Sequence, residues 1–425
     1  MSKRKSFWGG VVTGALAVLL IAGGVYLGSS AWKLYSIANT EKDAVKQKTE
    51  TEQGKETEQE AAGIIGDSVA NKRTLQKLEV LENAIDQFYL ESADSETLES
   101  GVYKGLIQSL GDPYSTYYTA EELADLEEKS SGVYYGIGAY VGIDTATALP
   151  VLTSIIEGTP AEESGLRAGD LVYKVDGQEI QGMELNQAVS LIKGAEGTVV
   201  HLTIIREGEM DYLEIDVTRR KVESPTVEYE MLDDHIGYIG IVEFDDITVD
   251  QFAEGLAVLR GKGMEGLILD LRGNPGGNLS AVCEIARQML PEGLIVYTED
   301  KYGERDEYTC DGTRQMTEKL VVLINEGSAS ASEILAGAVK DYQMGTLMGM
   351  TTFGKGIVQR VLTLTDGSAV KLTVSKYFTP NGNDIHKLGV TPDIEIPFDA
   401  DAFYDEGIDN QLEEAILVMK ELLSE

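Results

Sequence analysis

A short apolar strand that passes through a serine-rich turn into a helix constrains the fold most strongly. Residues 320–324, Leu-Val-Val-Leu-Ile, are predicted to form a buried strand, and residues 334–339 a helix. The turn between them contains Ser330. Backbone N–H groups are unpaired at the N-terminus of a helix, and the helix dipole favours negative charge there. The serine therefore either caps the helix or lies where an oxyanion can be stabilised.

Length and charge limit the class of protein. The 425 residues are enough for two or three domains with a sizeable core. An excess of 72 acidic residues over 35 Lys and Arg argues against nucleic acid or an anionic membrane surface as a partner. Cys283 and Cys310 are too few for a disulfide framework. The three histidines have no metal-ligand companions nearby, so we expect no metal site and no cofactor.

The first part of the chain is predicted to anchor it. Three basic residues at 3–5 precede an uncharged apolar run at 7–28, which is long enough to cross a bilayer. We therefore expect a cytoplasmic tip and a transmembrane anchor over 1–32, a polar linker over 33–63, and a single-pass protein of the cell membrane whose remaining residues lie outside the cytoplasm. A cleaved signal peptide is the alternative, but the apolar run exceeds the usual length of about 7–15 residues.

A helical region over 64–130 is followed by a glycine loop. Apolar residues at spacings of three and four predict an amphipathic helix at 75–88, and a second helical stretch runs over 98–110. Short strands and turns then follow over 131–220. This part resembles a PDZ domain, which implies a β-rich domain with two helices. In that family the glycine loop binds the terminal carboxylate of a peptide, which adds as a strand. The matching positions are Gly136, Ile137, Gly138 and Ala139.

Strands and helices alternate over 221–398, which predicts a mixed α/β core. The strand at 266–271 leads into the loop 270–277, Asp-Leu-Arg-Gly-Asn-Pro-Gly-Gly. Its paired glycines allow backbone N–H groups to reach a ligand without an intervening side chain. Asp270 and Arg272 in this loop are expected to pair with each other or to hold the loop.

Lys355 lies in a segment, 349–356, that nearly matches a phosphate-binding loop. A glycine stands where that motif needs a hydroxyl, and the residues that follow predict a strand instead of a helix, so we reject a nucleotide hydrolase. Alternatively, a lysine with a lowered pKa can take the proton of Ser330. Gln359 falls on the same face of the predicted strand and would orient the amine if the two side chains meet. A surface lysine is the commonest fate of this residue type.

Several separated motifs together resemble one protease family. They are Gly-Asp-Pro-Tyr-Ser at 111–115, Asp-Leu-Arg-x-Asn-x-Gly-Gly at 270–277, Gly-Ser-Ala-Ser-Ala-Ser-Glu at 327–333, Phe-Gly-Lys-Gly at 353–356 and Gly-Val-Thr-Pro-Asp at 389–393. With the PDZ-like region between the first two, this order resembles the carboxyl-terminal processing, or tail-specific, proteases, which are serine peptidases of family S41. The resemblance implies an α/β multidomain protein with a crotonase-like protease core.

The resemblance also implies a catalytic site and a function. Ser330 would be the nucleophile, Lys355 the general base, and Gln359 the residue that positions the lysine. The oxyanion hole would combine the N–H of Ala331 with that of Gly276 or Gly277. The function so implied is a serine endopeptidase that recognises unstructured C-terminal tails through a PDZ domain, which also gates the site, and cleaves proteins outside the cytoplasm. A catalytically inactive PDZ scaffold that binds peptides is the alternative.

The last residues, 399–425, are predicted to contain an amphipathic helix. Its apolar residues Leu412, Ala415, Ile416, Met419 and Leu422 fall on one face. This face either packs on the core of the same chain, which we favour, or forms a homodimer. Asp341 matches an aspartate of the family, but it lies three helical turns beyond Ser330, so we expect a structural role.

Overall fold

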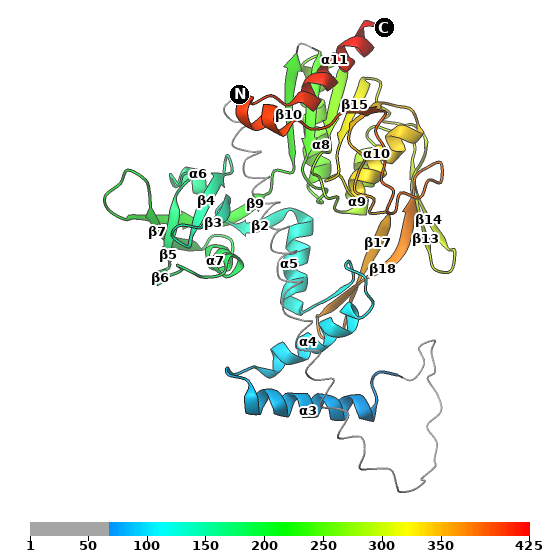
Figure 1. The fold of residues 1–425 in the computed structure, drawn as a ribbon. Coiled ribbons are helices and arrows are strands. Elements are labelled where there is room, and N and C mark those ends of the chain that lie inside the picture. The colour runs from blue at the N-terminus through cyan, green and yellow to red at the C-terminus, as the bar shows by residue number, and fades with distance from the viewer. Residues whose placement is uncertain (1–67, 234) are drawn as a thin grey trace, which may run out of the picture.

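The computed structural model describes residues 68–425 apart from residue 234. These residues form a helical N-terminal part, a small β-rich domain and a larger α/β core (Figure 1). The predicted membrane anchor at 7–28 and the linker at 33–63 lie outside the described residues. Between residues 68 and 425, no helix is both long and apolar enough to cross a membrane.

Three helices and one short strand make up the N-terminal part. They are α3 (Lys72–Phe88), α4 (Ser95–Gln108), β1 (Thr116–Tyr118) and α5 (Ala120–Ser131). The side chains of Asn71 and Asp94 cap α3 and α4 by accepting a backbone N–H. Both predicted helices therefore form, although α3 buries none of its residues.

The β-rich domain is built on an antiparallel sheet in the order β3-β4-β5-β7-β8, with β6 paired to β5. Its strands are β3 (Ala139–Asp144), β4 (Leu149–Ile155), β5 (Leu171–Val175), β6 (Gln178–Glu179), β7 (Val199–Ile205) and β8 (Leu213–Thr218). Two helices, α6 (Pro160–Glu163) and α7 (Leu185–Ile192), pack on its separate apolar core. β2 (Val133–Gly136) and β9 (Arg220–Glu223) pair where the chain enters and leaves the domain. The predicted β-rich domain with two helices is confirmed.

The main sheet of the core has the order β10-β11-β12-β15-β16-β19, with β10 antiparallel to five parallel strands. Its strands are β10 (Val227–Asp233), β11 (Ile236–Ile241), β12 (Gly266–Asp270), β15 (Lys319–Ile324), β16 (Thr346–Gly349) and β19 (Ile394–Glu395). Helices α8 (Thr248–Gly261), α9 (Leu279–Ala286) and α10 (Ala331–Asp341) cover one face. Because strand side chains alternate between faces, Leu267 and Leu269 pack with these helices and Ile268 faces the other side.

A second sheet, in the order β1-β18-β13-β14 with β17 also paired to β18, joins the core to the N-terminal part. Its core strands are β13 (Gly293–Asp300), β14 (Arg305–Cys310), β17 (Ile357–Thr363) and β18 (Ala369–Phe378). β1 pairs with β18, with Thr116 opposite Lys371. The predicted mixed α/β core is therefore confirmed, and one of its sheets includes a strand, β1, from the segment before the β-rich domain.

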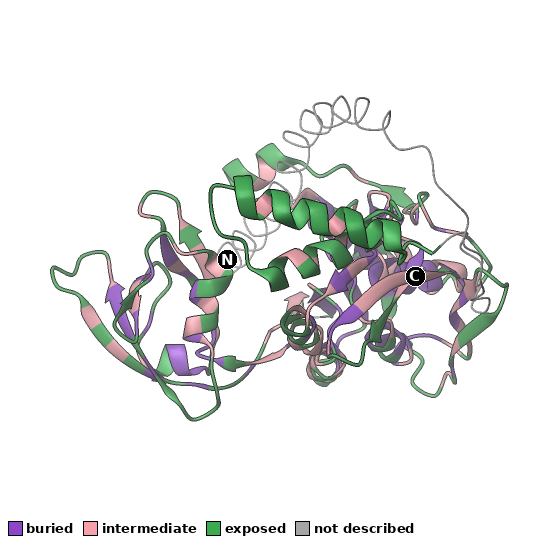
Figure 2. Cartoon of the chain, turned by 90° about the horizontal axis from the view of Figure 1, so that it is seen from below, coloured by how far each residue is buried: buried purple, intermediate pink, exposed green. Residues whose placement is uncertain are grey.

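The C-terminal segment packs on the open face of the main sheet. It consists of a one-turn π-helix, η1 (Ala402–Glu406), and α11 (Asn410–Ser424). Leu412, Ala415 and Met419 of α11 are buried against the strands, while the outer side of the helix is exposed. Figure 2, seen from below, shows the mostly exposed N-terminal helices in front and the buried residues in the two domains behind them. The Met419 sulfur would lie only 2.3 Å from a Cβ on Gly266, so the helix approaches the strand closely. This is the packing on the same chain that the sequence favours.

Candidate active site

Ser330 lies at the N-terminal end of α10, directly after β15 and its turn, as predicted. Its backbone has φ +55° and ψ −111°, a conformation that costs a non-glycine residue roughly 1–3 kcal/mol. Two contacts hold this strained residue. Its N–H donates to Glu333 Oε2 at 2.8 Å, and its carbonyl oxygen accepts from the Tyr377 hydroxyl at 2.9 Å. Backbone strain maintained by surrounding contacts is typical of functional sites.

Glu333 joins the turn of Ser330 to the loop of Lys355. Its side chain is fully buried. The carboxylate accepts hydrogen bonds at 2.6 to 2.8 Å from Ser330 N, Thr352 Oγ1, Gly354 N and Lys355 N. A buried carboxylate is costly unless its oxygens are hydrogen-bonded, and here donors from both segments converge on it. The role of Glu333 was not predicted from the sequence, although a glutamate three residues after a helix-capping serine is a visible signal.

Lys355 lies in the loop before β17, and its side chain is half-buried. Burial lowers the pKa of the Lys355 amine, and the charge of Lys371 adds to this effect, whereas Glu333 and Asp112 oppose it. The net pKa is lower than usual, which favours the neutral amine that a general base requires. Its Nζ lies 4.8 Å from the centroid of the Tyr114 ring. The sequence places Tyr114 only within the motif 111–115, so its position over the amine is a finding of the structure.

The backbones of Ser330 and Lys355 share the Glu333 carboxylate, but no hydrogen bond joins the three predicted catalytic side chains in the described part of the chain. Among the described residues, Lys355 Nζ donates neither to Ser330 Oγ nor to Gln359. The Gln359 amide nitrogen instead donates to Thr373 Oγ1 at 3.4 Å. Lys355 precedes the first residue of β17, so the alternation of side chains along this strand does not extend to it. The strand-face relation that the sequence suggested for Lys355 and Gln359 therefore has no support in the strand itself.

The loop that follows β12 lies against the turn of Ser330. A Cβ on Gly276 would be 2.8 Å from Ser330 Cβ and 3.0 Å from Ala331 N, so only glycine fits there. The Gly276 N–H donates to the Asn274 side chain at 2.8 Å. Within the described part of the chain, the N–H groups of Ala331 and Gly277 have no acceptor. Gly276 is favoured as the second oxyanion donor because it lies beside Ser330. Gly277 is favoured because its N–H has no acceptor among the described residues and is free to bind an oxyanion.

Asp270 and Arg272 form a buried ion pair, as expected, and the pair extends to the C-terminal segment. Arg272 Nη2 lies 2.6 Å from Asp270 Oδ2 and 2.8 Å from Asp409 Oδ2. Arg272 Nη1 also donates to Gln411 Oε1 at 2.9 Å. The network ties the loop 270–277 to the first residues of α11, so the C-terminal helix supports the glycine loop beside Ser330.

The segment Gly136–Ala139 links β2 to β3, the edge strand of the PDZ sheet. Gly138 has φ +86°, and a Cβ there would lie 2.3 Å from Thr159, so a glycine is required. The side chain of Ile137 is buried in the domain core. Ile137 can therefore offer only its backbone to a ligand.

The structure agrees with the rejection of a nucleotide site at 349–356 and with a structural role for Asp341. The segment 349–356 leads into β17 and not into a helix, as expected when the nucleotide site was rejected. Asp341 accepts hydrogen bonds from Asn381 N at 2.8 Å and from the Asn383 side chain at 3.2 Å. It supports a loop and makes no contact with Ser330 among the described residues, in keeping with a structural role.

Comparisons with known proteins agree with this architecture. Residues 235–396 match the model of peptidase family S41, residues 151–206 that of the PDZ domain, and residues 18–122 that of the N-terminal domain of the activating protease CtpB. The carboxy-terminal processing protease CtpA of Bacillus subtilis is 38% identical over 344 residues, which cover 78% of this chain and 73% of the relative. The carboxyl-terminal-processing protease of Synechocystis is 38% identical over 292 residues, covering 68% of each chain.

Another relative and one solved structure are similar over most of the chain. The carboxy-terminal processing protease CtpB of Bacillus subtilis is 35% identical over 328 residues, covering 76% of this chain and 68% of the relative. The structure of the photosystem II D1 C-terminal processing protease is 32% identical, with a TM-score of 0.45, and covers 75% of this chain and 86% of that one.

Proposed function

Because the chain belongs to the carboxy-terminal processing proteases of family S41 and is a serine-type peptidase, we propose that Ser330 and Lys355 are its catalytic dyad. Gln359 would position the lysine. The observation that carries this proposal is the buried Glu333 carboxylate, which binds the backbone of both Ser330 and Lys355. A shared carboxylate fixes the two segments relative to each other, which is the precondition for proton transfer between their side chains.

The reaction follows from the chemistry of the two groups. The neutral Lys355 amine takes the proton of the Ser330 hydroxyl as Oγ attacks the carbonyl carbon of the scissile peptide bond. The resulting ammonium then gives this proton to the leaving amine, and an ester links Ser330 to the acyl part. Water hydrolyses the ester with the same lysine as base. In the free enzyme Nζ lies against the Tyr114 ring, and a hydrogen bond from the Ser330 hydroxyl to Nζ must form to begin the cycle.

The negative oxygen of the tetrahedral intermediate requires donors beside Ser330. We assign the N–H of Ala331 and one N–H of the pair Gly276–Gly277 to this oxyanion hole. Ala331 is the first residue of α10, so its N–H points out of the helix N-terminus, where the dipole favours negative charge.

The PDZ domain is proposed to select substrates with unstructured C-terminal tails. An edge strand, β3, begins directly after Gly138 and can accept a peptide as an additional strand. Backbone N–H groups of the segment Gly136–Ala139 would bind the terminal carboxylate. Binding of a tail brings an extended chain to the protease core, so folded proteins without an unstructured tail are not cleaved.

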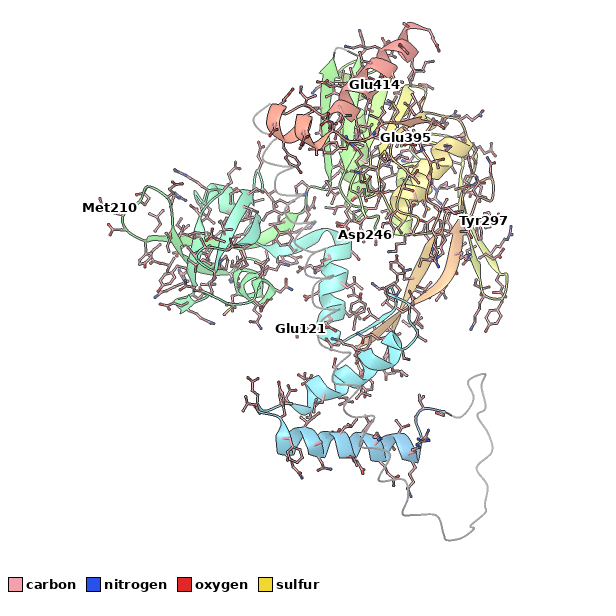
Figure 3. The ribbon with its side chains drawn as sticks, viewed as in Figure 1. Glu121, Met210, Asp246, Tyr297, Glu395 and Glu414 are labelled. Atoms are coloured by element: carbon pink, nitrogen blue, oxygen red, sulfur yellow. The ribbon has the colours of Figure 1, made fainter. Side chains whose placement is uncertain are left out.

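The attachment of the PDZ domain suggests how it gates the site. At the end of α5, just before the domain, Ser130 O accepts hydrogen bonds from Asp246 N at 3.2 Å and from the Asn278 side chain at 3.0 Å. Figure 3 shows Asp246 where α5 meets the core. Asn278 follows Gly277 in the chain, and Asn278 N donates to Phe244 O at 2.6 Å. A movement of the domain can therefore reach the proposed oxyanion hole through this junction.

The apolar run at 7–28 and the basic residues before it support a single-pass anchor with the protease outside the cytoplasm. The proposed enzyme is thus a membrane-attached endopeptidase that acts on extracytoplasmic proteins.

The test is cleavage of an unstructured peptide by the full-length protein in detergent. The Ser330→Ala and Lys355→Ala variants should lose cleavage, whereas a Ser424→Ala control at the exposed end of α11 should retain it. Cleavage by Ser330→Ala would contradict the dyad. Failure of the unmodified protein to cleave any such peptide that it binds would indicate the peptide-binding scaffold instead. A peptide with an amidated C-terminus should be cleaved more slowly, and equal rates would contradict carboxylate recognition by the PDZ domain.

A further inference from the structure

The turn 111–115 holds an aromatic ring against the amine of Lys355. Tyr114 N donates to Asp112 Oδ1 at 3.0 Å, and Ser115 Oγ donates to Asp112 Oδ2 at 2.6 Å. Ser115 Oγ in turn accepts from Thr373 N of β18 at 3.1 Å. The turn is therefore fastened to the core sheet, and the ring is placed by a network that does not involve Lys355.

The face of an aromatic ring attracts a cation and not a neutral amine. Lys355 becomes a cation at one point of the proposed cycle, after it has taken the proton of Ser330 and before it delivers that proton to the leaving amine. We propose that Tyr114 is a positioning residue whose ring holds the protonated Lys355 side chain during this interval. The inference rests on the proposed role of Lys355 as general base, and it adds a residue that the serine–lysine pair alone does not supply.

Other charged groups face the same amine. Asp112 and Glu333 favour its protonated form, and Lys371 on β18 disfavours it. Lys371 has its own aromatic neighbour, with Nζ 5.3 Å from the Tyr118 ring centroid. Tyr114 is the one described residue whose ring lies against the Lys355 amine. Its removal should therefore weaken the base without changing the formal charge of the site.

The experiment measures the pH dependence of peptide cleavage by the full-length enzyme. Activity should rise with pH as Lys355 loses its proton. In Tyr114→Leu the ammonium loses the ring but stays covered by an apolar side chain, so the pKa of Lys355 falls. The rising limb of kcat/KM should move about 0.4 to 1.5 pH units lower. Because a weaker base accepts the proton less readily, kcat at the high-pH plateau should fall roughly two- to tenfold.

Conservative replacements separate positioning from packing. Tyr114→Phe keeps the ring, so the rising limb of kcat/KM and the high-pH value of kcat should equal those of the unmodified enzyme. Replacement of that phenylalanine by a trifluorinated phenylalanine keeps the shape but weakens the negative ring face, so it should reproduce the shift of the leucine variant in a folded protein. Tyr302→Leu is the matched control, because Lys301 Nζ lies 5.0 Å from the centroid of the Tyr302 ring, which is exposed on the surface. It should change neither quantity.

The inference is overturned if the limb stays in place in both the leucine and the trifluorinated variants. A loss of rate by the same factor at every pH would also overturn it, because that result indicates a packing defect. These outcomes are distinct from a failure of the proposed function, which would appear as residual cleavage in Ser330→Ala or Lys355→Ala.

Discussion

Replacement of Glu333 by glutamine tests how the site is held together. The side chains are nearly the same size, but the amide has one acceptor oxygen in place of two and carries an NH2 group. In the structure Oε2 accepts from Ser330 N and Lys355 N, and Oε1 accepts from Gly354 N and Thr352 Oγ1. Whichever way the amide is turned, its NH2 group faces at least one backbone N–H that cannot accept a hydrogen bond.

The magnitude follows from the number of donors lost. If the amide oxygen replaces Oε2, Gly354 N loses its acceptor, and if it replaces Oε1, both Ser330 N and Lys355 N do. The amide should adopt the first orientation, which loses only one backbone donor. Because each unsatisfied buried donor costs about 1–3 kcal/mol, Glu333→Gln should lower the free energy of unfolding by about 1–3 kcal/mol. The assay combines urea denaturation with peptide cleavage. We expect kcat to fall at least tenfold, because the strained Ser330 and the Lys355 loop lose their common support.

A matched control is Glu284→Gln on the exposed side of α9, where the carboxylate pairs with Arg287. This change should alter neither the free energy of unfolding nor kcat appreciably. If Glu333→Gln unfolds at the same urea concentration as the unmodified protein and cleaves at the same rate, Glu333 does not link the two halves of the site.

Three further changes have defined outcomes. Gly277→Ala should lower kcat at least tenfold in the cleavage assay, because a Cβ there would lie 2.2 Å from a backbone carbonyl oxygen. Asp409→Asn keeps a helix-capping side chain but removes one charge from the Arg272 network, so the free energy of unfolding should fall by about 1–3 kcal/mol in urea. Burial and two neighbouring carboxylates raise the pKa of Asp245 to about 7. The folded state prefers its protonated form, so the free energy of unfolding should fall as pH rises from about 4 to about 7 and level off above that, and Asp245→Asn should abolish that fall.

The order of elements could be predicted because it is encoded locally. The apolar run at 320–324 and the serine turn after it gave both β15 and the position of Ser330. The alternation of strands and helices over 221–398 gave the mixed sheet. The C-terminal helix could be placed because its apolar residues repeat on one face, and Leu412 and Met419 are buried against the core.

Local sequence patterns could not predict the roles of residues that depend on contacts with distant parts of the chain. Glu333 appeared as part of a helix start, and only the fold shows that the loop of Lys355 shares its carboxylate. Tyr114 lies far from Lys355 in the chain, and β1 brings the two together by pairing with β18. The relation between Lys355 and Gln359 was inferred from strand periodicity, but the strand begins after Lys355, so that periodicity does not include it.

The most direct test is a crystal structure of the enzyme with a peptide boronic acid bound to the Ser330 hydroxyl. Such an adduct imitates the tetrahedral intermediate, so the base must be in its working position. We predict that Lys355 Nζ lies within about 2.6–3.2 Å of Ser330 Oγ. A structure in which a substrate-like ligand occupies the site while Nζ remains out of reach of Oγ would contradict the proposed proton transfer.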